Sequence, residues 1–497
     1  MSALLVLAVT VPLLGLAPLF LLRPGAGARI AVAVLGVGCA ITGAIAVQVA
    51  RTGQALHYFV GGFPPPLGVA LRADGFSAAM LCMSAMVLLL TGLFAIAGGG
   101  GKAPRMPAAF FTLLLALSSA LNLAFLAQDL FTLYVALELL TFAAVPLVCL
   151  EGKAGQLSAA LTYLLFALFG SVLYLLGVVL VYGLFGTLDL ALLARRLAQA
   201  PPSGTFIAAL ALMSAGLMAK AALFPLHLWL PPAHSGAPPA ASAVLSAVVI
   251  KAPLFLLVRL WSDLAPLPLA QAGAPVLAAF GALAILFCGV VALAQDRLKL
   301  LIAYSTAAQI GYLCLMFPLA AAADGQWSAL AWTGGTLHLV SHAFSKAAMF
   351  LAAGLIAEAM GHDRLSGLAG AGRVAPVSVA AFGIGGLSLM GLPPSGGFIA
   401  KVMLLTSAIH QDAWWIALVI LAGGLLAGAY VLRVVVIALQ RPEPAEAGRV
   451  PPARECGARA GIALALAFAA VLLGFLPLAP FAFLSIGRPL SWTGLLP

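Results

Sequence analysis

The sequence predicts an all-α integral membrane protein, and its composition and its long apolar segments both support that fold class. Of the 497 residues, 64% are hydrophobic and 8% are charged, whereas about a quarter of the residues in a soluble domain are charged. Apolar segments of roughly 18 to 28 residues recur along the whole chain, and about 20 helical residues cross a hydrocarbon core. Helices are the expected spanning element because they satisfy their own backbone hydrogen bonds.

Fourteen transmembrane helices are expected from these segments. The first segment has no charged residues before its apolar part, so we expect it to be retained as a helix and not cleaved as a signal peptide. The polar segments between the spans predict no sizeable soluble domain. The expected spans are 3–22, 29–50, 74–97, 107–126, 129–149, 158–185, 206–233, 240–261, 273–294, 298–320, 330–358, 376–408, 413–438 and 459–486.

Positive charges are distributed unevenly between the loops. The net charge is +10, but the basic residues form no dense run, so nucleic acid is not an expected partner. Loops after odd-numbered spans carry thirteen lysines and arginines, Lys299 among them, and the other loops with the C-terminus carry six. We expect a multi-pass protein of the bacterial inner (plasma) membrane. By the positive-inside rule, both of its termini are expected on the non-cytoplasmic side.

Cofactor motifs are missing from the sequence. The six cysteines have no CxxC spacing and five lie in apolar spans, where a thiol commonly serves as a small hydrophobe. There is no phosphate-binding lysine loop and no dinucleotide-binding glycine pattern between a strand and a helix. We therefore expect no cofactor, no metal and no catalytic chemistry of its own, with the energy coming from an ion gradient or a partner subunit.

Lysine is concentrated inside the expected spans. Four of the seven lysines (Lys220, Lys251, Lys346 and Lys401) lie there, but of the seventeen arginines we place only Arg433 inside a span. A desolvated lysine can release its proton near neutral pH, whereas arginine stays protonated. A charge at bilayer depth costs at least about 2.5–3.5 kcal/mol, so each lysine needs a partner, water or a changed pKa. A proton path is favoured over structural ion pairs.

Glu138, in DLFTLYVALELLTF, is the expected counter-charge of Lys220. It is the one acidic residue deep inside an expected span, because Asp129 lies nine residues earlier, about 13 Å along a helix. A buried Glu and Lys on different helices can form a pair whose separation changes the proton affinity of the lysine. The alternative is a static pair that only fixes the register of the helices.

A stripe of titratable residues is predicted in HLVSHAFSKAAMF. His338, His342 and Lys346 follow at i, i+4 and i+8, so successive members lie about 40° apart around a helix. Imidazoles titrate near neutral pH and relay protons; a metal site with two histidines is the alternative, but it has no evident third ligand. His234 lies between two proline-rich pieces and is either a proton relay or a loop cap.

Two spans are expected to be broken close to a lysine. Prolines in membrane helices free backbone groups, and broken helices in transporters lie at their transport sites. The lysine precedes the break in the seventh span and follows it in the twelfth, which is the order that an inverted repeat produces. The expected break residues are Pro225 and Pro231 in the seventh span and Pro393, Pro394 and Gly396 in the twelfth.

The repeat divides the chain into four parts. Residues 107–261 and 273–438 are the expected five-helix repeats, preceded by 1–100 and followed by 459–497. The titratable groups then form an intramembrane line parallel to the bilayer, through which protons move by way of water. In order, its members are Glu138, Lys220, Lys251, the group of His338, His342 and Lys346, and Lys401.

These segments carry a family resemblance. FTLYVALELLTF, AKAALFPLHLWLPPAHSG, DRLKLLIAYSTAAQIGY, HLVSHAFSKAAMFLAAG and GLSLMGLPPSGGFIAKVMLL are similar to the proton-conducting antiporter-like subunits of respiratory complex I, membrane-bound hydrogenases and Mrp-type antiporters. The resemblance implies fourteen helices with two inverted five-helix repeats. It also implies that Glu138 and Lys220 form a modulating pair, that Lys251 and the His338 region form the central relay, and that Lys401 is the terminal proton site.

Within the superfamily, the chain resembles the D-type subunit of Mrp antiporters most closely. The segment GGFPPPLGVALRADGFSAAM and the lysine at 401 fit that subunit, whereas the complex I subunit of similar length commonly has a glutamate at the terminal site. We therefore expect a subunit of a monovalent cation (Na⁺)/H⁺ antiporter, with other membrane subunits as partners. The alternative is a proton-pumping subunit of an NADH-quinone oxidoreductase or a hydrogenase; a solitary alternating-access transporter is disfavoured because no single pocket stands out.

Overall fold

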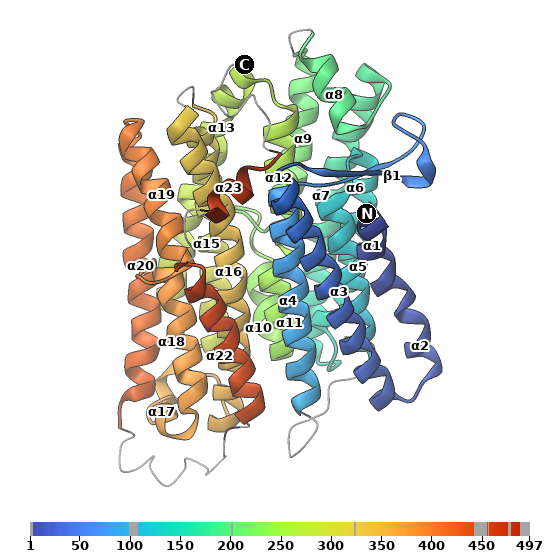
Figure 1. Cartoon of the computed structure of the whole chain (residues 1–497). Coiled ribbons are helices and arrows are strands. Elements are labelled where there is room, and N and C mark those ends of the chain that lie inside the picture. The colour runs from blue at the N-terminus through green and yellow to red at the C-terminus, as the bar shows by residue number, and fades with distance from the viewer. Residues whose placement is uncertain are drawn as a thin grey trace.

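Helices run side by side along one axis to form the body of the molecule (Figure 1). The computed structural model describes residues 3–98, 108–199, 202–322, 325–441, 455, 457–475 and 479–487. Within these ranges the only sheet is a pair of short antiparallel strands. The predicted all-α membrane fold class is therefore confirmed, with one small β-hairpin that the sequence pattern does not predict.

The hairpin joins the second and third expected spans. Gly61 and Gly62 have φ values of 68° and 80° in the loop between its strands, a conformation that glycine adopts without steric cost. The next helix begins at an N-cap in which Asp74 accepts a hydrogen bond of 2.9 Å from the backbone N–H of Ser77. This part comprises α1 (Ala3–Leu14), α2 (Leu16–Leu21), α3 (Pro24–Thr52), β1 (Leu56–Phe59), η1 (Val60–Gly62), β2 (Ala70–Ala73) and α4 (Gly75–Ala97).

The next five expected spans contain the first interruption. Asp129 and Ser203 cap the helices that follow them by accepting hydrogen bonds from backbone N–H groups. The eighth span alternates between α and π geometry. The elements are α5 (Ala108–Leu126), α6 (Leu130–Val148), α7 (Ala154–Phe185), α8 (Leu190–Leu197), α9 (Gly204–Lys220), α10 (Leu230–Gly236), α11 (Pro239–Val244), η3 (Leu245–Val249), α12 (Lys251–Arg259) and η4 (Leu260–Leu264).

The remaining helices contain the second interruption, between α18 and α19. Ser395 caps α19 by accepting a hydrogen bond of 3.1 Å from the backbone N–H of Phe398. The elements are α13 (Leu267–Leu283), η5 (Ala284–Cys288), α14 (Gly289–Ala294), α15 (Leu298–Ala320), α16 (Gly325–Met360), η6 (Leu365–Gly367), α17 (Ala371–Val374), α18 (Pro376–Met390), α19 (Gly396–His410), α20 (Trp414–Leu439), α22 (Gly457–Leu472) and α23 (Ala479–Ser485).

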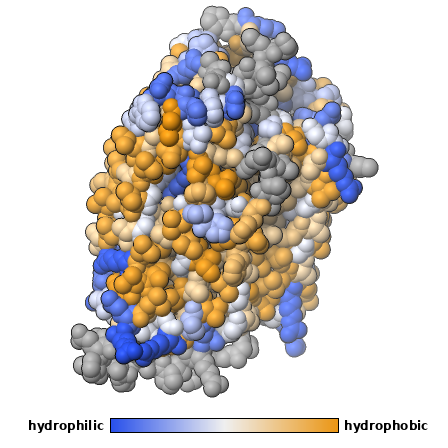
Figure 2. All heavy atoms as spheres, turned by 60° about the vertical axis from the view of Figure 1, so that its left-hand side comes forward, coloured by the Kyte–Doolittle hydropathy of each residue, from blue (hydrophilic) through white to orange (hydrophobic). Residues whose placement is uncertain are grey.

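Length and apolarity agree with the fourteen expected crossings. Eleven helices among the described residues are long and apolar enough to cross a membrane. The three further crossings are α9 with α10, α18 with α19, and α22, whose apolar helices are shorter. Figure 2 shows hydrophobic residues over the middle of the molecule and hydrophilic residues gathered towards its two ends, the distribution expected of a surface that faces lipid.

The loops alternate between the two ends of the bundle. The hairpin after α3 and the short helix α8 after α7 lie at one end, and α17 after α16 lies at the other (Figure 1). Orientation in the membrane stays a prediction from the loop charges. Five of those charges lie outside the described residues: Lys102, Arg105, Arg449, Arg454 and Arg488.

The centre of the bundle is formed by α16 and by the irregular eighth span. The most apolar windows of these two spans are completely buried within the chain, and that of α15 is nearly so. A helix that is apolar all round belongs in the core of a large protein. Polar residues on these spans are therefore enclosed by the protein, away from lipid.

Candidate functional site

Four buried lysines are the most unusual feature of the interior. Lys220, Lys251, Lys346 and Lys401 are 7%, 1%, 0% and 6% exposed. Two of them lie at irregular backbone: Lys220 is the last residue of α9, and Lys251 follows the π-helical turn η3. Lys401 lies inside α19, and its ammonium group contacts the carbonyl of Leu389 at the end of α18, just before the break. Irregular backbone frees carbonyl oxygens that can accept hydrogen bonds from an ammonium group.

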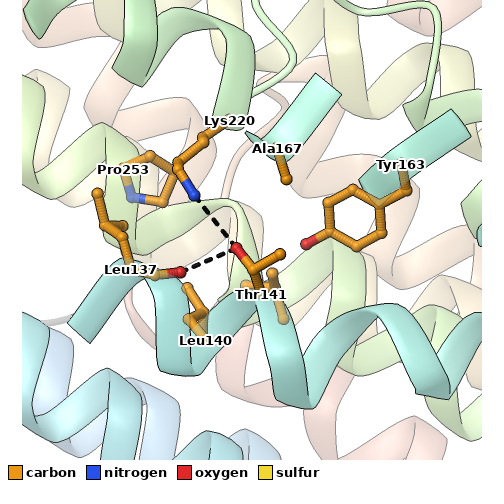
Figure 3. Close-up of a pocket in the computed structure, with 8 residues that line it drawn as sticks. Leu137, Leu140, Thr141, Tyr163, Ala167, Lys220 and Pro253 are labelled. Atoms are coloured by element: carbon orange, nitrogen blue, oxygen red, sulfur yellow. Dashed lines mark hydrogen bonds between the residues drawn. The ribbon is translucent and has the colours of Figure 1, made fainter. Parts of the chain in front are cut away.

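Lys220 is paired with Glu138. Its Nζ lies 3.1 Å from Oε1 of Glu138 and 3.2 Å from Oγ1 of Thr141, both on α6. Ser171 on α7 donates a hydrogen bond to the same carboxylate oxygen. Figure 3 shows the Lys220 side chain pointing to Thr141, whose hydroxyl donates to the carbonyl of Leu137. The pair predicted from the sequence is thus formed, and hydroxyl groups complete its hydrogen bonds.

Close contact between α7 and α9 positions this pair. A Cβ added to Gly216 would lie 2.4 Å from the carbonyl oxygen of Gly170, and one added to Gly170 would lie 2.6 Å from that of Gly216. Small residues at such positions let membrane helices approach backbone to backbone. The approach brings Ser171 on α7 and Lys220 on α9 to the same carboxylate.

A small cavity borders Lys220 on the side of the eighth span. Its volume is about 10 Å³, and roughly 10–15 Å³ is needed to hold one water molecule. Polar groups at its wall include the Thr141 hydroxyl and the Lys220 ammonium (Figure 3). A water there would extend the polar line towards α12. The lining residues are Leu137, Leu140, Thr141, Tyr163, Ala167, Lys220, Val249 and Pro253.

Lys251 links the eighth span to α16. Pro253 has no N–H to donate to the carbonyl of Val249, four residues earlier. The π-helical turn η3 ends at Val249. Nζ of Lys251 lies 2.5 Å from Nδ1 of His342. The other ring nitrogen, Nε2 of His342, is buried without a protein hydrogen-bond partner, so it is available to a water or to a moving proton.

The stripe on α16 faces α15. Nε2 of His338 lies 3.2 Å from the backbone carbonyl of Gln309, and Nζ of Lys346 lies 2.5 Å from Oγ of Ser305. The rings of His338 and His342 are 6.0 Å apart between centroids. Among the described residues, no group of three histidines, cysteines or carboxylates could hold a metal ion. Within the part of the chain that the structure describes, the two histidines have no such third ligand beside them.

The side chain of Lys401, a residue of α19, reaches the C-terminal end of α18. Its Nζ lies 2.6 Å from the carbonyl oxygen of Leu389 and 3.5 Å from that of Met390. It also lies 4.3 Å from the centroid of the Tyr312 ring. Gly391 has a φ of 80°, and a Cβ there would come within 2.8 Å of Cδ of Lys401. Glycine is therefore needed both for the turn and for the passage of the lysine side chain.

His234 is enclosed in the protein. It lies in α10 and is 0% exposed, and neither ring nitrogen has a protein hydrogen-bond partner. Its ring lies 6.1 Å from the rings of Trp229 and Phe350. A loop cap needs a hydrogen bond from the side chain, and His234 makes none within the described residues; its role as a proton relay stays a prediction. Buried polar atoms of this kind are usually satisfied by ordered water.

The positions of the two breaks are close to those expected. The first occupies residues 221–229, which include Pro225, and the second occupies 391–395, which include Pro393 and Pro394. Pro231 differs from the expectation, because it is the second residue of α10, a position where proline starts a helix. Gly396 likewise starts α19.

Lys299 is the main correction to the sequence-based expectations. The sequence places it among the loop charges, but it lies in the first turn of α15, is 8% exposed and donates a hydrogen bond to the backbone carbonyl of Ala237. Thr141, Ser171 and Ser305 are further partners that the sequence pattern does not indicate. The spacing of Thr141, three residues after Glu138 on one helix face, is the signal that could have found it.

A many-span helical bundle whose buried lysines lie at broken helices defines an antiporter-like membrane subunit. The chain belongs to the family described as NADH:quinone oxidoreductase/Mrp antiporter, TM, which matches residues 127–427. It is therefore a multi-pass membrane subunit of the kind found in Mrp and complex I-type assemblies.

Individual relatives come from both branches of the family. The chain is 34% identical over 84% of its length to the NADH-quinone oxidoreductase subunit N of Desulforudis audaxviator, covering 84% of that protein. It is 28% identical to the D-type subunit of the Na⁺/H⁺ antiporter of Bacillus subtilis, over 80% of this chain and 78% of that protein. A chain of the Mrp complex from Dietzia sp. is 26% identical with a TM-score of 0.88, over 99% and 98% of the two chains.

Proposed function

We propose that this chain translocates protons as a subunit of a multisubunit Mrp-type Na⁺/H⁺ antiporter. The observation that carries the proposal is the buried series in which Lys220 pairs with Glu138, and Lys251 with His342. The Mrp assignment is supported by the similarity to the Dietzia complex over nearly the whole chain. Partners are then other membrane subunits, and the transported ions are protons and Na⁺.

The Glu138–Lys220 pair is the proposed control point. While the carboxylate is 3.1 Å away, the ammonium form of Lys220 is favoured by the opposite charge. Movement of Glu138 away from Lys220 changes the proton affinity of the lysine. Thr141 and the adjacent cavity then offer the proton a way towards the eighth span, through one water and the turn that carries Lys251.

The central relay continues along α16. Lys251 exchanges its proton with His342 across 2.5 Å, and His338 lies one helical turn further towards Lys401. Lys346 and His234 are side branches of the relay in this scheme, with Lys346 held by Ser305. Lys401 is the terminal site, where the ammonium is held by the carbonyl oxygens at the end of α18.

The test of the proton path measures proton uptake into liposomes that contain the purified complex. Glu138→Gln, Lys220→Met and Lys401→Arg are each expected to lower the flux at least about tenfold; Lys401→Arg asks whether the terminal group must release a proton. Lys153→Met is the matched control, because that side chain is 71% exposed and paired only at the surface with Glu151.

Two interpretations of the ion pair predict different results in this assay. If Glu138 and Lys220 form a static structural pair, Glu138→Gln with normal assembly leaves the flux unchanged. Retained flux in all three assembled variants would refute the proton path. Loss of flux with normal assembly, and with an unaffected Lys153 control, supports it.

A second candidate function is a proton-pumping subunit of a redox complex. The specific observation that favours it is the 34% identity to a subunit of NADH-quinone oxidoreductase. Copurification decides between the two: small membrane subunits without a chromophore are expected for an Mrp-type antiporter. Partners that carry flavin or iron–sulfur absorbance would instead assign the chain to a redox complex.

A further inference from the structure

Two carbonyl oxygens at the end of α18 cannot be satisfied by the helix itself. In an α-helix each carbonyl accepts from the N–H four residues later. The residues four after Leu389 and Met390 are Pro393 and Pro394, which have no N–H. Both oxygens are therefore open to a cation, and the ammonium of Lys401 lies 2.6 and 3.5 Å from them.

The side-chain amide of Gln309 lies beside this pair of carbonyl oxygens and can supply a third oxygen. Gln309 on α15 is 2% exposed; its Oε1 has no hydrogen bond in the structure, and its amide also interacts with the hydroxyl of Tyr430 on α20. Its Nε2 lies 3.4 Å from the carbonyl oxygen of Leu389. A half-turn of the amide exchanges its nitrogen and oxygen, so the oxygen can take a place next to that carbonyl.

The surroundings suit a single positive charge. Titratable groups around Lys401 are Tyr312 on α15 and His338 and His342 on α16, with Tyr430 of α20 beside Tyr312; none is a carboxylate. The face of the Tyr312 ring, 4.3 Å from Nζ, attracts cations. A divalent ion would add an uncompensated charge to this buried region, whereas a monovalent ion in place of the ammonium leaves the local charge unchanged.

We infer that the carbonyl oxygens of Leu389 and Met390 and the amide oxygen of Gln309 form a binding site for a desolvated monovalent cation, in competition with the ammonium of Lys401. Oxygen atoms from unwound backbone and helix ends are the usual ligands of Na⁺ in transporters. Two positive charges cannot share the site, so the cation enters as Lys401 releases one proton and moves aside. This inference rests on the proposed function and gives it a place where Na⁺ and H⁺ exchange.

The experiment measures protons released on addition of Na⁺ to the purified intact complex, in weak buffer with a pH-indicator dye and with choline as the control ion. The wild-type complex is expected to release protons with Na⁺ and not with choline. Gln309→Leu is expected to shift the Na⁺ titration to about tenfold higher concentration, the effect of losing about 1.4 kcal/mol of binding. Lys401→Met is expected to abolish the part of the release that comes from this site.

Two further variants keep the test decisive. Gln309→Met preserves the length of the side chain and removes the amide, so it gives the same answer if Gln309→Leu does not assemble. Gln128→Leu removes another buried glutamine, 7% exposed and at the junction of α5 and α6, and is expected to titrate as the wild type does.

Three outcomes would overturn the cation site. They are no Na⁺-dependent release in the wild type, an unchanged titration in an assembled Gln309 variant, and full release from Lys401→Met. If the Glu138 and Lys220 variants lose proton flux while the Gln309 variants keep the Na⁺ titration of the wild type, only the cation site is refuted. If flux is retained in those variants, the proposed function itself is refuted.

Discussion

Replacement of Asp74 by alanine is expected to destabilise the end of the bundle that carries the hairpin. Asp74 is 1% exposed, and both of its carboxylate oxygens lie 2.5 Å from Nη2 of Arg259. It also lies 3.3 Å from Nη2 of Arg72 on β2 and caps α4 through Ser77. One carboxylate thus connects the hairpin, the start of α4 and the end of the eighth span, which carries Lys251.

The size of the effect follows from what the substitution leaves behind. In Asp74→Ala the guanidinium of Arg259, 4% exposed, keeps only Asp263 at 3.8 Å as a counter-charge. Leaving a buried charge without its partner costs about 3–5 kcal/mol, and Asp263 places the expected cost at the lower end. The lost N-cap adds about 1 kcal/mol. Asp74→Leu combined with Arg259→Met removes both charges and is expected to recover at least half of the loss.

The assay is thermal unfolding of the purified complex in detergent, followed by the reaction of buried cysteines with a thiol-reactive fluorophore. Asp74→Ala is expected to lower the apparent unfolding temperature by at least about 5 °C, given roughly 2–4 °C per kcal/mol for a domain of 150–250 residues. Asp363→Ala is the control, because its partner Arg297 is 55% exposed and such surface pairs contribute about 0–1 kcal/mol. Unfolding of Asp74→Ala within about 1 °C of the wild type would refute the reasoning.

Two predictions concern the surroundings of Lys220 and are checked by proton flux in liposomes. Thr141→Val removes the hydroxyl that lies 3.2 Å from the Lys220 ammonium and keeps the shape of the side chain. The loss of one hydrogen bond, about 1 kcal/mol, is expected to lower the proton flux about fivefold. A decrease of less than about twofold would contradict this role of Thr141. Gly216→Val places a Cβ 2.4 Å from a backbone oxygen of α7 and is expected to reduce flux more than about tenfold, because overpacking displaces the lysine. Gly183→Val, whose Cβ would meet nothing within 4 Å, is expected to behave as the wild type; equal flux in both glycine variants would contradict the close approach of the helices.

The fold class and the paired charges can be predicted from the sequence, because both follow from the free-energy cost of placing unpaired polar or charged groups in a hydrocarbon core. A hydrocarbon core excludes unpaired backbone, so apolar segments of sufficient length had to be helices. An ionised side chain at that depth needs a partner, so Lys220 and Glu138 could be matched without a structure. Prolines 225, 393 and 394 showed where the helices are interrupted, since proline cannot donate a backbone hydrogen bond.

Other features depend on which helices are neighbours, and periodicity along one helix does not give that information. Lys299 lies at the start of its helix, where a lysine is ordinarily solvated, and it is buried only because α10 and α15 pack together. The contact of Lys251 with His342 joins residues 91 positions apart. The sequence does not predict the hairpin, because two four-residue strands give little alternation to detect, although the glycines and prolines of GGFPPP indicate a turn.

The contact between Gly170 and Gly216 limits the kind of motion that can accompany transport. Helices that meet backbone to backbone can slide past each other only by first moving apart, and here there is no room for even one added Cβ at either glycine. The changes at Lys220 are then confined to the rotation of side chains, the exchange of a water and the linker at 221–229. Such local rearrangements occur in nanoseconds to microseconds, whereas rocking of whole domains takes microseconds to milliseconds. In the proposed mechanism, turnover in this half of the protein is therefore expected to depend on hydration and side-chain rotation, with the temperature dependence of a gated water wire and not of a moving carrier.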